Sequence, residues 1–105
     1  MSLQVLKTDD PGTIRLIGEV DVSNVHALRD ALRDEIQDGA HLTLDLEGLA
    51  FLDSTGIQLI VRTARELQGR GTLTLRSPGD LVRRTLELVP VERLGNVHIV
   101  EGDGA

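Results

Sequence analysis

Residues 42–56 read LTLDLEGLAFLDSTG and join an alternating apolar pattern to a short polar turn. Leucine occupies every second position from 42 to 46, with one polar residue between each pair. This period of two places one row of side chains on a single face of a sheet, so we predict a strand that is about half buried. The polar turn at its end contains Ser54, and we expect the function of the protein to lie there.

A helix is predicted directly after this turn. Its apolar residues recur at offsets of three and four and form one stripe that packs on the sheet: Ile57, Ile60, Val61, Ala64 and Leu67. Ser54 then falls in the first helical turn, where free backbone N–H groups and the positive end of the helix dipole favour a hydroxyl acceptor and favour a phosphate more. The spacing alone leaves two interpretations of Ser54, a helix cap or a modified residue.

Strand patterns recur along the rest of the chain. They are predicted at residues 3–7, 13–20, 72–76 and 97–100. A cluster of turn formers at residues 8–12 makes a hairpin of the first two. Apolar residues on both faces of the second strand are typical of a strand inside a covered sheet, and Gly18 within it permits close approach of another backbone.

Two further helices are predicted, one on each side of the central pattern. The earlier one has an apolar stripe at helical spacing, with Ser23 or Asn24 as its N-cap and Gly39 as its end. The later one starts with Ser77 as a hydroxyl cap, followed by a proline at the first helical position, and it ends before Pro90.

Strands that are separated by single amphipathic helices require crossover connections, which produce a mainly parallel sheet. We therefore predict one α/β domain over residues 1–105, a mixed β-sheet with an antiparallel N-terminal edge strand, packed by amphipathic helices. Its core is expected to span about residues 3–100, with a flexible tail at 101–105. Sites in such sheets gather beyond the carboxyl ends of the strands, which is where Asp21 and Ser54 fall.

The composition favours a protein as the partner. The net charge of −6 argues against binding to a nucleic-acid backbone or an anionic membrane. Phe51 is the only aromatic residue, so the chain has no surface on which bases could stack. The sequence has no basic leader followed by an apolar segment and no apolar run long enough for a membrane span, so we expect a cytoplasmic location.

No metal, cofactor or catalytic group is predicted. The chain has no cysteine, and His26, His41 and His98 lack the short spacings of a metal site. No G-x-S-x-G motif surrounds Ser54, so the serine lacks the sequence context of a hydrolase nucleophile. We therefore do not expect an enzyme.

Two segments also carry a family resemblance. Residues 44–60, LDLEGLAFLDSTGIQLI, resemble the signature of the STAS domain and, within that family, of the bacterial anti-sigma factor antagonists. In that signature an aspartate, a phosphorylatable serine, a variable residue and a glycine follow a buried strand. The segment IGEVD at residues 17–21 is similar to the second signature of the family, and the resemblance extends over roughly residues 5–100.

The resemblance implies a switch between two partners. The unphosphorylated chain would bind an anti-sigma factor, itself a serine kinase, and thereby release the sigma factor. Phosphorylation of Ser54, with Thr55 as the second candidate, would abolish binding, and a phosphoserine phosphatase would reverse the modification. The kinase would supply ATP and Mg²⁺, so no cofactor is implied for this chain.

The expected partner-binding residues lie in the two segments that follow strands: Asp21, Ser23, Asn24, Asp53, Ser54, Thr55 and Gly56. Asp21 is interpreted either as a cap of the following turn or as a partner contact. Asp53 either fixes its loop by hydrogen bonds or positions the serine hydroxyl, and Gly56 leaves room for the partner to approach the backbone.

Two alternative functions remain open at this stage. The chain could be a constitutive STAS accessory subunit of a transporter ATPase or a signalling scaffold, with Ser54 as an interface contact only. It could also be a sensor of a small ligand or nucleotide that uses the same strand-end crevice. The sequence does not indicate an oligomeric state.

Overall fold

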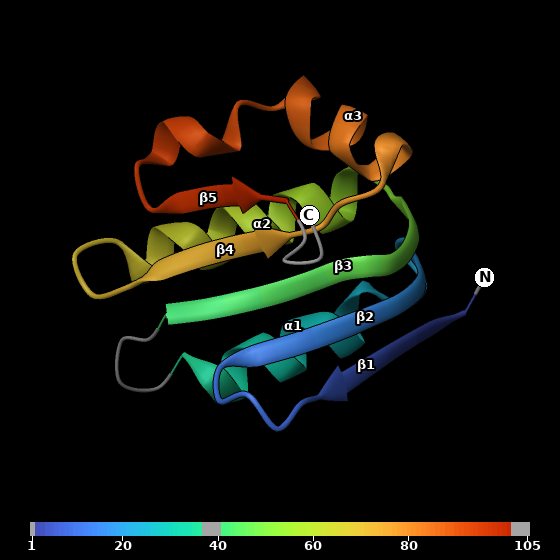
Figure 1. Cartoon of the computed structure of the whole chain (residues 1–105), viewed down its shortest axis with the longest axis horizontal. Helices are drawn as coiled ribbons and strands as arrows, with labels where there is room; N and C mark the ends of the chain where they lie inside the picture. Colours follow the sequence, from blue (N-terminus) through green and yellow to red (C-terminus); the bar gives the residue numbers. More distant parts are fainter. Residues whose placement is uncertain (1, 37–40, 102–105) are drawn as a thin grey trace.

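The computed structural model describes residues 2–36 and 41–101 (Figure 1). The elements follow in the order β1 (Leu3–Lys7), β2 (Thr13–Val20), α1 (Val25–Glu35), β3 (His41–Leu52), α2 (Ser54–Leu67), β4 (Thr72–Arg76), α3 (Asp80–Leu88), the 3₁₀ helix η1 (Val91–Leu94) and β5 (Val97–Val100). Each predicted strand and helix is present. The predicted end of the first helix at Gly39 and the predicted flexible tail beyond Glu101 lie outside the described residues.

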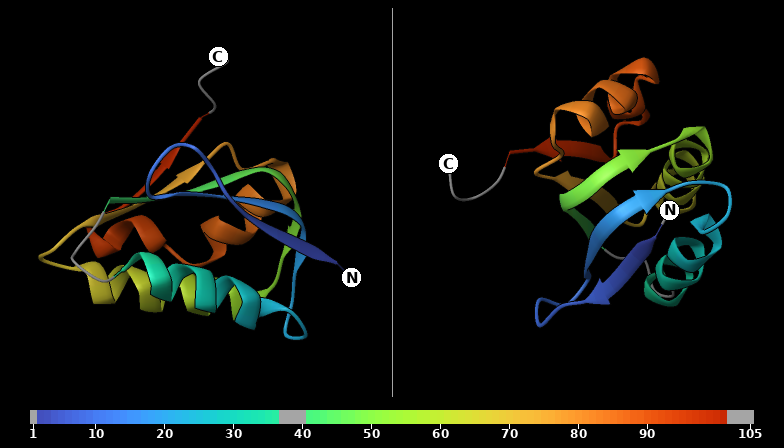
Figure 2. Two further views of the ribbon diagram at one scale, coloured as in Figure 1. Left: turned by 90° about the horizontal axis from the view of Figure 1, so that it is seen from below. Right: turned by 90° about the vertical axis from the view of Figure 1, so that its right-hand side faces the viewer.

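The sheet has the order β1-β2-β3-β4-β5, in which β1 is antiparallel to β2 and the other pairs are parallel. The predicted mixed sheet with an antiparallel edge strand is confirmed. Because the strand order follows the chain and crossovers between parallel strands are right-handed, successive helices fall on the same face. Figure 2 shows α1 and α2 side by side on that face, while no helix of the described residues lies on the opposite face.

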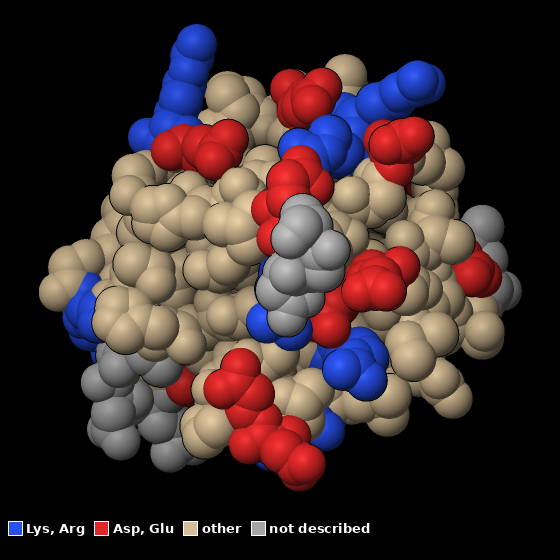
Figure 3. Space-filling model, in the orientation of Figure 1, with Lys and Arg blue, Asp and Glu red and all other residues tan. Residues whose placement is uncertain are grey.

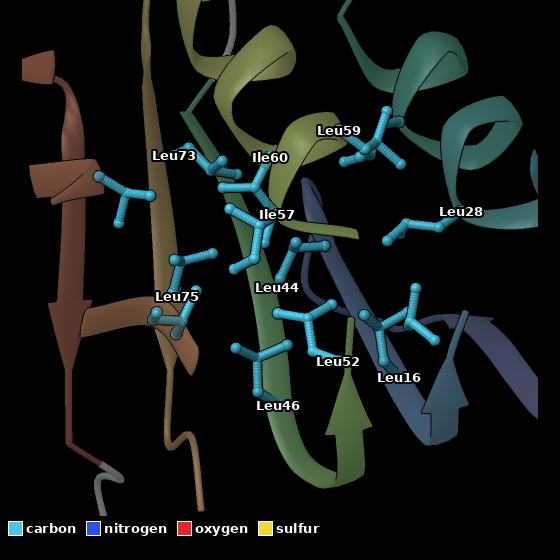
Figure 4. Close-up of a cluster of buried hydrophobic side chains, with 14 of the residues drawn as sticks. Leu16, Leu28, Leu44, Leu46, Leu52, Ile57, Leu59, Ile60, Leu73 and Leu75 are labelled. Atoms are coloured by element: carbon cyan, nitrogen blue, oxygen red, sulfur yellow. The ribbon is translucent and has the colours of Figure 1, made fainter. Parts of the chain in front are cut away.

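The core lies between the sheet and the helices. The alternating leucines of β3, Leu42, Leu44 and Leu46, are at most 1% exposed, as the period of two predicts. They pack with apolar side chains from α1, α2 and β4, drawn in Figure 4 and including Leu28, Ile57, Ile60, Leu73 and Leu75. Full burial of a side chain of this size contributes about 1.5–3 kcal/mol, so the central strand is the main apolar support of the fold.

The prediction that β2 lies inside a sheet covered on both faces is wrong. Ile14 and Leu16 point toward the helices and are buried, but Ile17 points to the uncovered face and is 37% exposed. Val20, an even number of residues after Leu16, lies on the buried face as the period of two requires. The close approach expected at Gly18 is confirmed, since a Cβ there would lie 2.2 Å from the carbonyl oxygen of Ser2.

The predicted cap of the third helix is also wrong. Helix α3 begins at Asp80, Gly79 occupies the N-cap position, and no side-chain hydrogen bond caps the helix. Ser77 has a φ of 58°, and its N–H donates to the carbonyl oxygen of Val100 at 2.8 Å. Since Ser77 still pairs with the end of β5, the helix can begin only after the chain has turned away from the sheet.

The uncovered face of the sheet carries a buried carboxylate between two arginines. Asp45 on β3 accepts from Arg15 of β2 and from Arg76 of β4, each at 3.3 Å. Burial acts to raise the pKa of Asp45, but the hydrogen bond from the backbone of Glu47 and those from the two arginines outweigh it and hold the pKa below its ordinary value. Figure 3 shows acidic and basic side chains intermixed over this face.

Candidate functional site

The turn between β3 and α2 is held by Asp53. This residue is the N-cap of α2, and its Oδ1 accepts from the N–H of Thr55 at 2.9 Å, from the N–H of Gly56 at 3.2 Å and from the hydroxyl of Thr55. A carboxylate at this position satisfies helix N–H groups that lack intrahelical partners and interacts favourably with the helix dipole. The interpretation of Asp53 as a loop-fixing residue is confirmed, and the interpretation of Ser54 as the helix cap is wrong.

The two candidate hydroxyls differ in their surroundings. Ser54 is the first residue of α2 and is exposed, and its Oγ makes no hydrogen bond to another residue within 2–36 or 41–101. The side chain of Thr55 is half-buried, and its hydroxyl already donates to Asp53. Of these two residues, Ser54 is therefore the one that presents an uncommitted hydroxyl at the surface.

The loop between β2 and α1 forms a second hydrogen-bonded turn. The carboxylate of Asp21 accepts from the N–H of Ser23 at 2.9 Å and from the Ser23 hydroxyl. The hydrogen bond from the Ser23 side chain is the main reason why the pKa of Asp21 lies below its ordinary value, against a smaller opposing effect of desolvation. Asp21 therefore organises its own turn, as one of its two interpretations predicted.

Asn24 occupies the N-cap position of α1 but does not cap the helix with its side chain. Its Oδ1 instead accepts from the N–H of Asp21 at 2.9 Å, and its Nδ2 donates to the carbonyl oxygen of Glu19 at 2.9 Å. The expectation of a side-chain cap from Ser23 or Asn24 is wrong because both side chains are used within the preceding loop.

The two turns lie next to each other at the carboxyl end of the sheet. The N–H of Asp53 donates to the carbonyl oxygen of Val20 at 3.1 Å, and Asp21 follows Val20 directly. Gly56 is buried at this junction, where a Cβ would lie 2.3 Å from Leu52 Cδ1 and 3.0 Å from Val20 Cγ1. The interior of the protein thus requires the glycine, which is a different reason from the expected room for a partner.

The structure adds two features that the sequence reasoning missed. Val22, in the loop after Asp21, is 73% exposed, and an apolar residue outside any periodic stripe could have drawn attention to it. The second feature is a groove between α1 and α2, which we call the α1–α2 groove. It has a volume of about 160 Å³ and is lined by Val25, His26, Arg29, Thr55, Gln58, Leu59 and Arg62.

The groove had no signal in the sequence. Its two arginines come from different helices, and the separation of Arg29 and Arg62 along the chain hides their proximity. Within residues 2–36 and 41–101, no three His, Cys, Asp or Glu side chains are grouped so that they could hold a metal ion. In the same described residues, no helix is long and apolar enough to cross a membrane.

Comparisons with known proteins find relatives along almost the whole chain. The family model described as Mlab, STAS domain, matches residues 3–101. An anti-sigma F factor antagonist from Lysinibacillus sphaericus is 34% identical over 83 residues, which cover 76% of this chain and 71% of that protein. An anti-sigma-B factor antagonist from Staphylococcus aureus is 29% identical over 104 residues, covering 97% of this chain and 94% of that protein.

Solved structures agree with this relationship. An anti-sigma factor antagonist from Mycobacterium paratuberculosis has a TM-score of 0.80 with 25% identity, over 92% of this chain and 86% of that chain. The anti-sigma factor antagonist SpoIIAA in its unphosphorylated form has a TM-score of 0.70 with 22% identity, over 93% of this chain and 87% of that chain. The second likeness shows a shared fold.

Proposed function

Because the chain belongs to the STAS domain family, we propose that it is an anti-sigma factor antagonist whose partner is an anti-sigma factor with serine kinase activity. In its unphosphorylated form it binds this kinase in the cytoplasm, and the sigma factor is released. Phosphorylation of Ser54 ends the complex, and a phosphoserine phosphatase restores the binding form. The chain acts as a substrate and regulator, not as an enzyme, since the kinase supplies ATP and Mg²⁺.

The observation that carries the proposal is the contrast between the two adjacent hydroxyls. The exposed Oγ of Ser54 is free to meet the γ-phosphate of a docked kinase. Thr55 would first have to break its hydrogen bond to Asp53, which also holds the start of α2 in place. Ser54 is therefore the favoured acceptor, with Asp21, Ser23, Asn24, Asp53 and Thr55 forming the surrounding partner surface.

The fold can accept a phosphate on Ser54 without unfolding. The group would lie at the exposed first turn of α2, where the positive end of the helix dipole favours an anion. Two N–H groups of this turn, those of Thr55 and Gly56, already donate to Asp53, so the chain offers the phosphate few further donors. The added charge therefore remains at the surface, beside the carboxylate of Asp53.

This exposed charge is sufficient to switch a complex off. A phosphate adds about −1.5 to −2 charges at neutral pH, and a partner that closes over Ser54 would have to bury it. Leaving a buried charge without a partner costs about 3–5 kcal/mol. That cost lowers the affinity by roughly two to four powers of ten.

Capture from a native lysate tests the proposal, with Ser54→Ala as one bait and Ser54→Asp as the other. We expect the alanine form to retain a serine kinase that the aspartate form loses. The captured kinase is then purified and incubated with ATP and each of three proteins, the wild type, Ser54→Ala and Thr55→Val. We expect mass spectrometry to find phosphate on the wild type and on Thr55→Val but not on Ser54→Ala.

Other outcomes would support a different function. If both baits hold the same transporter ATPase or scaffold, the protein is a constitutive accessory subunit. If Thr55→Val abolishes phosphorylation and Ser54→Ala does not, Thr55 is the acceptor. Saturable binding of a nucleotide by the isolated chain would favour a sensor.

A further inference from the structure

The α1–α2 groove adjoins the candidate phosphorylation site, and the described residues that line it include two arginines and no acidic side chain. Thr55, the residue after Ser54, is part of its lining, together with Arg29, Arg62 and His26. Figure 2 shows the two helices side by side on the covered face of the sheet. A partner that reaches Ser54 along these helices would therefore meet the groove as well.

The positive charge of this surface contrasts with the negative net charge of the chain, which has 17 acidic and 11 basic residues. Arg62 lines the groove and also the two neighbouring hollows along α2. Among the described residues it forms no salt bridge, whereas Arg29 lies 3.6 Å from Asp30. Glu66 lines the two neighbouring hollows but is not among the described residues that line the groove.

The arginines on the uncovered face of the sheet provide a contrast. Arg15 and Arg76 share the carboxylate of Asp45, so part of their charge is compensated within the protein. Arg62 has no such compensation in residues 2–36 and 41–101, and its charge is available to an anion from outside.

The size of the groove indicates what kind of anion it accepts. A volume of about 160 Å³ is below the roughly 300–1,000 Å³ of sites that enclose a small organic ligand. It is several times the space of about 30 Å³ that one water molecule takes in the liquid. The groove therefore fits one or two side chains of a docked protein segment, with Val25 and Leu59 as its apolar part.

We propose that the α1–α2 groove is the docking site for an acidic segment of the kinase partner, with Arg62 as the main contact of its carboxylates and Arg29 as a second contact. This proposal rests on the proposed function and adds the chemistry of the partner. It also explains how Ser54 can control the complex. A phosphate beside Thr55 lies at the rim of the groove, where it repels the acidic segment and weakens the attraction of Arg62.

The test begins with a probe that does not require the kinase. The peptide acetyl-Glu-Leu-Glu-Glu-Leu-Glu-amide is titrated into the ¹⁵N-labelled protein at low salt and followed by NMR, and the same peptide with Gln in place of Glu is the matched probe. We expect saturable shift changes at Thr55, Gln58 and Arg62 with the Glu peptide only. Arg62→Gln should weaken this binding about two- to fivefold, as loss of an exposed ion pair predicts.

Arg84→Gln is the matched control variant, because Arg84 is an exposed arginine on α3 that does not line the groove. It should bind the Glu peptide like the wild type, and Ser54→Asp should bind it more weakly. Equal binding of the two peptides would overturn the proposal, as would shift changes away from the groove or equal effects of Arg62→Gln and Arg84→Gln.

The second arm uses the kinase that Ser54→Ala captures. In the Ser54→Ala background, calorimetry should show an affinity about tenfold lower for Arg62→Gln and unchanged for Arg84→Gln, because charge pairs are stronger in a desolvated interface. Unchanged affinity with Arg62→Gln would refute the docking site while leaving the role of Ser54 intact. Retention of the same partner by the Ser54→Ala and Ser54→Asp baits would refute the switch without affecting the peptide titration.

Discussion

Replacing Asp53 by alanine tests the assignment of the helix cap. The substitution removes the oxygen that accepts from the N–H groups of Thr55 and Gly56 and from the Thr55 hydroxyl. These donors are only partly buried, so water can hydrogen-bond to them when the carboxylate is removed. The loss of stability is therefore smaller than the sum of three separate hydrogen bonds. Loss of an N-cap aspartate costs about 0.5–2 kcal/mol, and the double N–H contact places Asp53→Ala at about 1–2 kcal/mol.

Two matched variants separate the effects that contribute to this value. Asp53→Asn keeps an acceptor oxygen and removes the charge, so it should lose only the charge–dipole part, about 0.3–1 kcal/mol. Ser54→Ala removes an exposed hydroxyl without a hydrogen bond in the described structure and should change the free energy of unfolding by less than about 0.5 kcal/mol.

The measurement is urea denaturation of the four proteins at neutral pH, followed by circular dichroism. The slope of the unfolding free energy against urea should be unchanged, because all four expose the same surface on unfolding. The reasoning fails if Asp53→Ala and Ser54→Ala are equally stable, or if Ser54→Ala is the more damaging change. The first result would show that Asp53 is not a stabilising cap, and the second would move the cap to Ser54.

Three further predictions concern the core and the uncovered face. Asp45→Asn leaves two arginines without their carboxylate and should destabilise the protein by about 1–3 kcal/mol at pH 7. Because folding lowers the pKa of Asp45, its ionised form stabilises the protein above the unfolded-state value of about 4, and this contribution is lost as the pH falls through the folded-state pKa. The stability difference between wild type and Asp45→Asn should therefore shrink below about pH 4, and a constant difference down to pH 2 would contradict this account. Gly56→Ala places a Cβ within 3.0 Å of two buried side chains, and thermal unfolding should show a net loss because overpacking at about 1–3 kcal/mol outweighs a gain in helix propensity of about 1 kcal/mol. Gly79→Ser, where a Cβ has open space, should be neutral, and equal melting temperatures of the two variants would refute the clash. Leu44→Ala, at a position with 0% exposure, should cost about 2–5 kcal/mol in urea denaturation, whereas Leu81→Ala on the exposed surface should cost little.

Some features of the site were predictable because they depend on local spacing. The helix start after Leu52 follows from the change of period from two to 3.6 at the turn. Asp21 and Asp53 were expected to lie close together because they follow two parallel strands, whose carboxyl ends lie at one edge of the sheet. Which residue caps α2 did not follow, because Asp53 and Ser54 are adjacent and either side chain can serve as an N-cap.

Other predictions were wrong because the structure at these positions depends on contacts with segments far away in the chain. Ser77 has the sequence context of a helix cap, but pairing with the end of β5, more than 20 residues later, keeps it in the sheet. Ile17 is exposed because the helices pack on the other face of the sheet, and the residue pattern within β2 does not indicate which face they cover. Neither error could have been avoided by a closer reading of the local sequence.

The sequence alone therefore determined the elements, their order and the position of the serine turn. This was possible because side-chain periodicity and right-handed crossovers are properties of the backbone that act locally. The tertiary structure alone decided which hydroxyl is free, which face of the sheet is covered and that Arg29 and Arg62 share one groove. These depend on distances between segments that are remote in the chain and on competition between neighbouring donors and acceptors, and both are set only when the helices pack on the sheet.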